Sequence, residues 1–187
     1  MTRAKRLLFE HQQAQSPHTE LSYLQSSGTQ YINTGILGQS GLKVEISCGG
    51  FTNFLFGSRV AFQNGAYYIY MSRFDYYTTA YNITWDNNIS HLYVIDNNLF
   101  YVDGALKATG STTQFNNSLN NYLFGCSTNG AFSSGSAKIY YCKIWNASGV
   151  LVRNLIPVIK TDGTYCMYDK TNSIYYPNVG TGVFIGG

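Results

Sequence analysis

Short strand-like runs separated by turn residues dominate this chain from Leu21 to its C-terminus. Each run holds about four to eight residues rich in Val, Ile, Tyr, Phe and Thr, a composition that favours β-strands. Clusters of Gly, Asn, Ser and Asp separate the runs, and Gly or Asn interrupts nearly every window that a long helix would need. The predicted strands are residues 31–34, 42–47, 54–58, 67–71, 76–81, 91–96, 99–102, 106–109, 122–125, 137–145, 151–159, 164–168 and 174–176.

Three of the connections carry residues that tolerate positive φ and therefore close tight hairpins: Asp96-Asn97-Asn98, Asp103-Gly104 and Asp162-Gly163. So many short antiparallel strands in 187 residues predict an all-β domain, built as a two-sheet antiparallel sandwich or jelly roll. A β-helix is the structural alternative, but no fixed repeat period supports it. Trp145, in the long strand near the end of the chain, is predicted to lie in the core.

Residues 1–20 differ in character from the domain predicted at residues 21–187. They contain no Gly, and residues 3–15 consist mostly of good helix formers, which Ser16-Pro17 then stops. This composition predicts a short helical or extended arm that cannot bury itself and that attaches the domain to a partner protein. A frayed terminus is the alternative. The predicted attachment residues are basic and apolar side chains: Arg3, Arg6, Leu7, Leu8 and Phe9.

The low charge of the chain excludes several classes of partner. Only 11% of residues are charged, and outside residues 1–6 the basic ones are scattered, which argues against nucleic-acid binding.

No apolar run approaches the roughly 20 residues of a membrane span. The apolar stretch at residues 7–9 is too short for a secretory signal, so we expect synthesis in the cytoplasm without export by that route. A surface polar through hydroxyls and amides suits sugars or other protein subunits.

The cysteines indicate neither a zinc site nor a disulfide framework. Cys48, Cys126, Cys142 and Cys166 form no CxxC pair, and the histidines are equally dispersed. Each cysteine lies in or beside an apolar run, which favours four buried free thiols over two disulfides.

Three segments resemble the laminin-G-like, concanavalin A-like jelly-roll superfamily. The opening segment, residues 21–35 (LSYLQSSGTQYINTG), is similar to the first strand of such domains in bacteriophage and gut-bacterial surface proteins. Residues 91–109 (HLYVIDNNLFYVDGALKAT) resemble the paired central strands with their YVDG hairpin, and residues 137–158 with 168–187 resemble the closing strands. The resemblance implies two curved antiparallel sheets with the first and last segments adjacent. It leaves function open, because this sandwich carries lectins, glycosidases, adhesion modules and structural parts.

Catalysis is not expected from these residues. Glycoside hydrolysis, the enzymatic option that the resemblance implies, needs two facing carboxylates. The domain holds one Glu, Glu45, and Asp75, Asp86 and Asp169 are the only Asp residues without a predicted hairpin role. His91, the domain histidine, lacks a recognisable Ser or Cys partner signature. The chain is therefore predicted to have no catalytic residues.

No cofactor is predicted, and calcium is the alternative. Calcium requires several oxygen ligands, usually including multiple carboxylates. The richest clusters are Asp86-Asn87-Asn88 and Asp96-Asn97-Asn98, which are interpreted as two turns. No metal ligand is assigned.

The segment from residue 67 to residue 85 concentrates groups that bind sugars. Aromatic rings stack on pyranose faces, and amides and charged groups hydrogen-bond the hydroxyls. Adjacent tyrosines in a strand point to opposite faces, so some of them cannot lie in a shared core. Packing of the sandwich faces or of a protein interface is the alternative. The predicted ligand-binding residues are Arg73, Asp75, Tyr76, Tyr77, Tyr81 and Trp85.

Together these features predict a non-enzymatic phage virion component, such as a capsid decoration, head fibre or tail-associated module, located on the virion surface. Its arm would hold a capsid or tail protein and its sandwich would bind a glycan or host surface. The alternative is a purely structural decoration protein without glycan binding. A bacterial adhesion module at the cell surface and a glycoside hydrolase are less favoured. A homo-oligomer, and a trimer if the protein is a fibre, is expected because exposed Tyr-rich faces are otherwise a liability.

Overall fold

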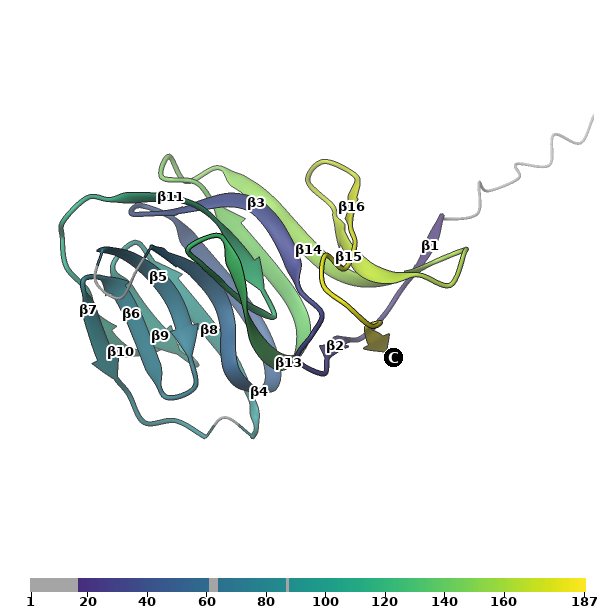
Figure 1. Ribbon diagram of the computed structural model, residues 1–187, viewed down its shortest axis with the longest axis horizontal. Helices are drawn as coiled ribbons and strands as arrows, with labels where there is room; N and C mark the ends of the chain where they lie inside the picture. Colours follow the sequence, from purple (N-terminus) through teal and green to yellow (C-terminus); the bar gives the residue numbers. More distant parts are fainter. Residues whose placement is uncertain (1–16, 61–63, 87) are drawn as a thin grey trace, which may run out of the picture.

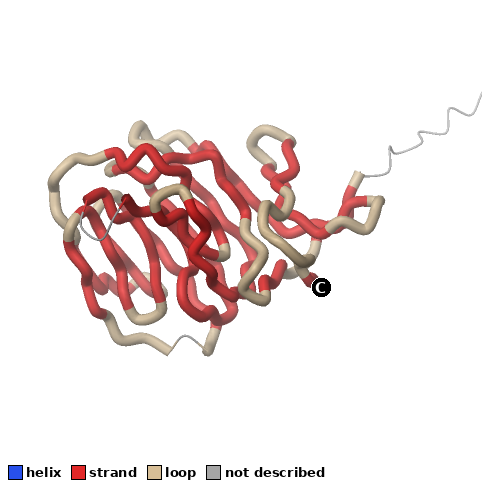
Figure 2. Tube along the Cα trace, viewed as in Figure 1, coloured by secondary structure: helices blue, strands red, loops and turns tan. Residues whose placement is uncertain are grey.

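Every regular element that the structure describes is a β-strand, as predicted for the domain at residues 21–187. The computed structural model describes residues 17–60, 64–86 and 88–187. Figures 1 and 2 show strands joined by turns throughout these ranges, with no helix. The described residues accordingly contain no helix long and apolar enough to cross a membrane.

The N-terminal arm is described only at its end. The helix predicted at residues 3–15 and the attachment residues Arg3, Arg6, Leu7, Leu8 and Phe9 lie outside the described residues. Residues His18–Glu20 form an extended strand, β1, which pairs antiparallel with β14 (Leu151–Lys160). The last residues of the predicted arm therefore extend a sheet of the domain.

The strands form two sheets, which we call sheet A and sheet B. Sheet A contains β1, β14, part of β4 (Lys43–Val60), part of β13 (Ala131–Trp145), β2 (Leu24–Ser26), β8 (Ser90–Asp96), β9 (Leu99–Val102), β10 (Ala105–Thr109), β15 (Tyr165–Asp169), β16 (Ile174–Tyr176) and β17 (Ile185–Gly186). Sheet B contains the rest of β4 and β13, with β3 (Ile32–Gln39), β5 (Asn64–Tyr70), β6 (Arg73–Tyr77), β7 (Thr79–Asn82), β11 (Asn116–Leu123) and β12 (Gly125–Thr128).

Two long strands, β4 and β13, pass from one sheet into the other. β4 pairs with β8 and β13 in sheet A and, from Phe54 onward, with β5 in sheet B. The prediction of two separate strands at 42–47 and 54–58 was wrong, because the chain continues in strand conformation through Gly49 and Gly50. The pairings are antiparallel except that of β12 with β4.

The opening and closing segments of the domain are neighbours, as the resemblance implied. β17 pairs with β2, and β2 pairs in turn with β13 (Figure 1). One core lies between the inner faces of the two sheets and contains side chains from both, including Ile46 and Ile139 of sheet A and Phe56 and Phe74 of sheet B. The arrangement is sandwich-like.

Turn chemistry accounts for most of the strand boundaries. Asn97, Asp103, Gly104 and Gly163 have positive φ and close the β8–β9, β9–β10 and β14–β15 hairpins, which confirms the three predicted turns. The single strand predicted at 76–81 was wrong, because Tyr77 also has positive φ and divides it into β6 and β7.

The burial of the four cysteines and of Trp145 was predicted from the sequence and can be compared with the structure. All four cysteines are buried free thiols, as predicted, and burial raises the pKa of the Cys48 and Cys126 thiols to about 12. The prediction for Trp145 was wrong, because this residue is only half-buried and Lys43 Nζ lies 5.4 Å from the centroid of its ring. Its neighbour Ile144 points into the core instead, as the alternation along β13 requires.

Buried tyrosines should make the fold sensitive to alkaline pH. Burial raises the pKa of Tyr76 to about 12 and raises the pKa values of Tyr67 and Tyr93 as well. A pKa that is higher in the folded state gives stability that is complete below the unfolded pKa near 10 and is lost as the pH rises towards the folded value. Each such tyrosine should lower the free energy of unfolding by about 1.4 kcal/mol per pH unit above 10.

Urea unfolding at pH 8 and pH 11, combined with phenolate absorbance, measures this effect. We expect a marked loss of stability at pH 11 and a group of tyrosines that ionises only as the protein unfolds. Reversible ionisation of all 17 tyrosines with the fold intact would contradict the burial described here.

Candidate functional site

The predicted ligand-binding residues divide between the two faces of sheet B and its margins. Strand β6 alternates, so Arg73 and Asp75 lie on the outer face while Phe74 points into the core. Tyr76 is 1% exposed, in contact with the rings of Tyr67 and Phe115. The prediction that Tyr76 contacts a ligand was wrong, because a core ring has no face left for a sugar.

The other three aromatic candidates do not join Arg73 and Asp75. Tyr81 and Trp85 are half-buried and pack on the core, Tyr81 with its ring centroid 6.2 Å from that of Phe74 and Trp85 at 5.8 Å from Phe100. Tyr77 lies against Phe115 at 5.6 Å and lines a separate hollow. These three residues therefore do not form one surface with the outer face of sheet B.

A hollow on the outer face of sheet B combines aromatic rings with charged groups, and Arg73 is the one of the six predicted residues that lines it. Its volume is about 280 Å³, near the lower end of the roughly 300–1,000 Å³ of ligand pockets, which suits a single sugar ring. We call it the arginine–tyrosine hollow. Its lining residues come from β4 and β5, with one from β6: Phe54, Arg59, Tyr68, Tyr70 and Arg73.

Strand register places these side chains together. Tyr70 of β5 pairs with Phe54 of β4 on one side and with Arg73 of β6 on the other. Tyr68, two residues earlier and on the same face, pairs with Asp75. The ring centroids of Phe54 and Tyr70 are 4.7 Å apart, so the two rings form an aromatic wall.

Gly57 of β4 allows β5 to approach closely at the arginine–tyrosine hollow. It has a φ of 134° and pairs with Tyr68. A Cβ atom at Gly57 would lie 2.1 Å from the carbonyl oxygen of Tyr67 and 2.4 Å from Tyr68 Cβ. The position therefore excludes any side chain.

A buried carboxylate organises the polar part of the hollow. Asp75 is 4% exposed, and Arg73 donates to both of its oxygens through Nε and Nη2. The Tyr68 hydroxyl also donates to Asp75. Hydrogen bonding to Asp75 raises the pKa of the Arg73 guanidinium, and burial, followed by the bond to Asp75, raises the pKa of Tyr68 to about 12. Arg73 and Tyr68 are therefore protonated at neutral pH and locked in orientation.

The second guanidinium reaches the same phenol oxygen. Arg59 Nη1 donates to the Tyr68 hydroxyl at 3.4 Å, and Arg73 Nη2 donates to it at 2.8 Å. The guanidinium carbon of Arg59 lies 5.3 Å from the Phe54 ring centroid and 5.4 Å from that of Tyr68, within the range of cation–π attraction. Two cationic donors thus converge beside the aromatic wall.

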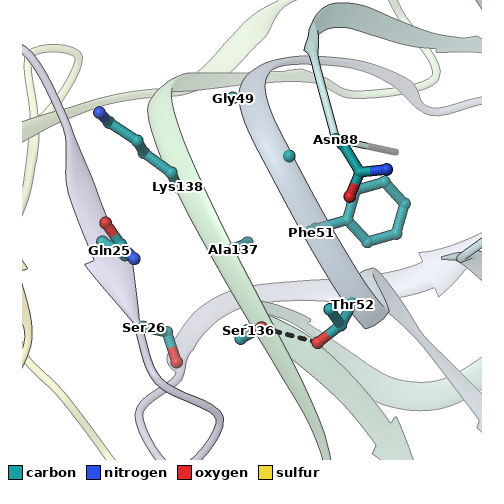
Figure 3. Close-up of a pocket in the computed structure, with 10 residues that line it drawn as sticks. Gln25, Ser26, Gly49, Phe51, Thr52, Asn88, Ser136, Ala137 and Lys138 are labelled. Carbon is teal, nitrogen blue, oxygen red and sulfur yellow. Dashed lines mark hydrogen bonds between the residues drawn. The ribbon is translucent and has the colours of Figure 1, made fainter. Parts of the chain in front are cut away.

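Another hollow, of about 270 Å³, offers different chemistry. Figure 3 shows Gln25, Thr52, Ser136 and Lys138 around it, from β2, β4 and β13. Thr52 Oγ1 and Ser136 Oγ lie 2.6 Å apart and bond each other. Lys138 Nζ lies 3.8 Å from the centroid of the Tyr23 ring and covers it. Phe51, the aromatic residue that lines this hollow, is only 5% exposed, so the hollow presents hydroxyls, amides and an ammonium group with little open ring face and suits a sugar less well.

The carboxylates that a glycosidase would need do not meet. Glu45 lies on the outer face of sheet A, where it accepts a hydrogen bond from the Tyr141 hydroxyl at 2.9 Å. Asp75 belongs to sheet B and is held by Arg73. His91 contacts Asp103 and the carbonyl of Asp86. Glu45 and Asp75 therefore cannot act as a pair on one glycosidic bond.

The acidic and amide clusters considered for calcium make local turns. Asp86 Oδ1 accepts hydrogen bonds from the backbone and side-chain nitrogens of Asn88, and Asn97 closes the β8–β9 hairpin. Within residues 17–60, 64–86 and 88–187, no group of three or more His, Cys, Asp or Glu side chains is placed to hold a metal ion.

Two of the lining residues, Phe54 and Arg59, lie outside the segment singled out from the sequence, and Tyr68 and Tyr70 lie within it but not among the six candidates. Alternation along each strand of the β5–β6 hairpin places residues 68 and 70 on the same face as residues 73 and 75, and this signal would have grouped three of the lining residues, Tyr68, Tyr70 and Arg73, with Asp75. Phe54 and Arg59 join only through the pairing of β4 with β5, which no local pattern predicts.

Comparison of the chain with models of protein families, with curated proteins and with solved structures gives no match. The resemblance to laminin-G-like domains therefore stays a prediction, and the hollow itself carries the functional inference.

Proposed function

We propose that this protein is a non-enzymatic display module that binds a glycan in the arginine–tyrosine hollow. The observation that carries this proposal is the convergence of Arg59 and Arg73 on the Tyr68 hydroxyl beside the ring of Tyr70. Sugar sites combine an apolar ring face with a few fixed polar groups, and here both are held by packing and hydrogen bonds. The separation of Glu45 from Asp75 supports binding over glycoside hydrolysis.

In this proposal the fold is a concanavalin A-like jelly roll carried on a virion surface. The adjacency of β2 and β17 and the passage of β4 and β13 through both sheets support the jelly-roll assignment. Attachment to a capsid or tail protein through residues 1–20, and assembly as a homo-oligomer, follow from the resemblance and from the composition of the arm.

Loss of the Tyr70 ring should weaken glycan binding by about twofold to tenfold, because ring stacking contributes about 0.5–1.5 kcal/mol beyond the burial of area. The full chain is first applied to a glycan array, and the best glycan is then titrated against the wild type and Tyr70→Ala by calorimetry. Tyr101→Ala is the matched control, because Tyr101 is a half-buried tyrosine on the outer face of sheet A.

We expect saturable binding that Tyr70→Ala weakens and Tyr101→Ala leaves unchanged, with both variants folded by circular dichroism. An array without any bound glycan would overturn the proposal in favour of a purely structural decoration protein. Equal binding by wild type and Tyr70→Ala would remove the hollow as the site.

A further inference from the structure

The charge of the arginine–tyrosine hollow points to a particular class of glycan. Arg59, Arg73 and Asp75 all bond the Tyr68 hydroxyl, so two guanidiniums and one carboxylate leave a net charge of +1 around one oxygen atom. Two cations held this close repel each other, and an added anion relieves that repulsion.

Arg73 retains donors for such an anion. Asp75 and Tyr68 engage its Nε and Nη2 atoms, while Nη1 bonds no partner among the described residues. The Arg73 side chain is 34% exposed, and it lines the hollow. Because Asp75 fixes the plane of the guanidinium, the Nη1 donors are oriented in advance of binding.

The aromatic wall adds a face for the sugar ring. Tyr70 is half-buried and pairs directly with Arg73, so a ring against Tyr70 lies next to the guanidinium. An apolar ring beside a fixed cation matches a pyranose that carries an acidic substituent.

We propose that the ligand of the arginine–tyrosine hollow is an acidic glycan, in which an anionic substituent binds Arg73 and Arg59 while the sugar ring packs against Tyr70. This assignment rests on the glycan-binding function proposed above. A carboxylate and a sulfate share the required chemistry, since both accept paired N–H donors from a guanidinium.

Three probes of equal length test the assignment: an oligogalacturonate, a neutral oligogalactan and a sulfated oligogalactan. We expect at least one acidic oligomer to bind the full chain about tenfold or more tightly than the neutral one at low salt. The difference should shrink at about 0.5–1 M salt, where charges on a partly exposed site are screened. Whichever acidic probe binds more tightly identifies the substituent.

Arg59→Gln and Arg73→Gln should both reduce acidic binding towards the level of the neutral oligomer. Arg59→Gln serves as the second variant, because Arg73→Gln leaves the buried Asp75 without its charged partner and can lower stability. Lys138→Gln is the matched control, a cation on the outer face of sheet A that lies outside the hollow.

Equal binding of acidic and neutral oligomers, with Tyr70→Ala still weakening both, would overturn the acidic assignment while leaving glycan binding intact. The acidic assignment would also be overturned if Arg59→Gln and Lys138→Gln reduced the binding of the acidic oligomer equally. Absence of binding to all three oligomers overturns the acidic assignment, whereas the proposed function is overturned by an empty glycan array or by a glycan that Tyr70→Ala binds as tightly as the wild type.

Discussion

Replacement of Gly135 by alanine is expected to lower the free energy of unfolding by about 3 kcal/mol or more, at the upper end of overpacking effects. A Cβ atom at this position would lie 1.7 Å from the carbonyl oxygen of Phe54 and 2.7 Å from its carbonyl carbon. Both atoms belong to the backbone of β4, so no rotamer change relieves the contact. The strands would have to separate.

The location of Gly135 makes this separation costly. Residues of β13 before Gly135 pair with β12 in sheet B, whereas Gly135 and its successors pair with β4 in sheet A. Separation there would disturb both sheets at once. Urea unfolding followed by circular dichroism measures the change, with Ser134→Ala, an exposed neighbour on the same strand, as the control. A midpoint for Gly135→Ala equal to that of the wild type would contradict the close approach of β4 and β13.

Removal of the Asp75 carboxylate is expected to have the second largest effect. Asp75→Ala leaves the Tyr68 hydroxyl and Arg73 Nε without their acceptor, and Arg73 Nη2 keeps only the Tyr68 oxygen. Breaking a fully buried ion pair costs about 3–5 kcal/mol, and exposure of a third of Arg73 reduces this to about 2–3 kcal/mol here.

A double-mutant cycle separates the network from simple loss of burial. Once Arg73 is already alanine, Asp75→Ala should destabilise the protein less than it does alone, because the two residues act on one interaction. Additive changes in the free energy of unfolding would contradict the coupling. Asp75→Ala should also weaken glycan binding, since Arg73 then loses the contact that fixes its orientation.

Strand content could be predicted from the sequence where β-branched and aromatic residues were abundant, and it was missed where they were scarce. β11 (NNSLNNYL) is rich in Asn, and only its end was predicted. It forms because β3 and β4 supply pairing partners, and buried Asn117 and Asn121 bond Ser58 from its neighbours. Tertiary contacts override the local propensity of such a segment.

The candidate site was predicted in part for a related reason. Composition located the Tyr-rich segment, and the alternation of side chains along a strand indicated that Tyr67 and Tyr68 point to opposite faces of the sheet. The positive φ of Tyr77 interrupts that alternation. The pattern before Tyr77 therefore does not predict which face the residues after it occupy. The contribution of Phe54 and Arg59 depended on the pairing of distant strands, which a single sequence does not specify.

The location of a bound acidic oligosaccharide tests the central proposal most directly. A crystal structure of the full chain with an oligogalacturonate or a sulfated oligogalactan, chosen by the titrations above, is predicted to show one sugar ring against Tyr70 and its anionic group within hydrogen-bond distance of Arg73 Nη1. Density for the sugar in another hollow, such as that formed by Gln25, Thr52 and Lys138, with the arginine–tyrosine hollow empty, would contradict the account.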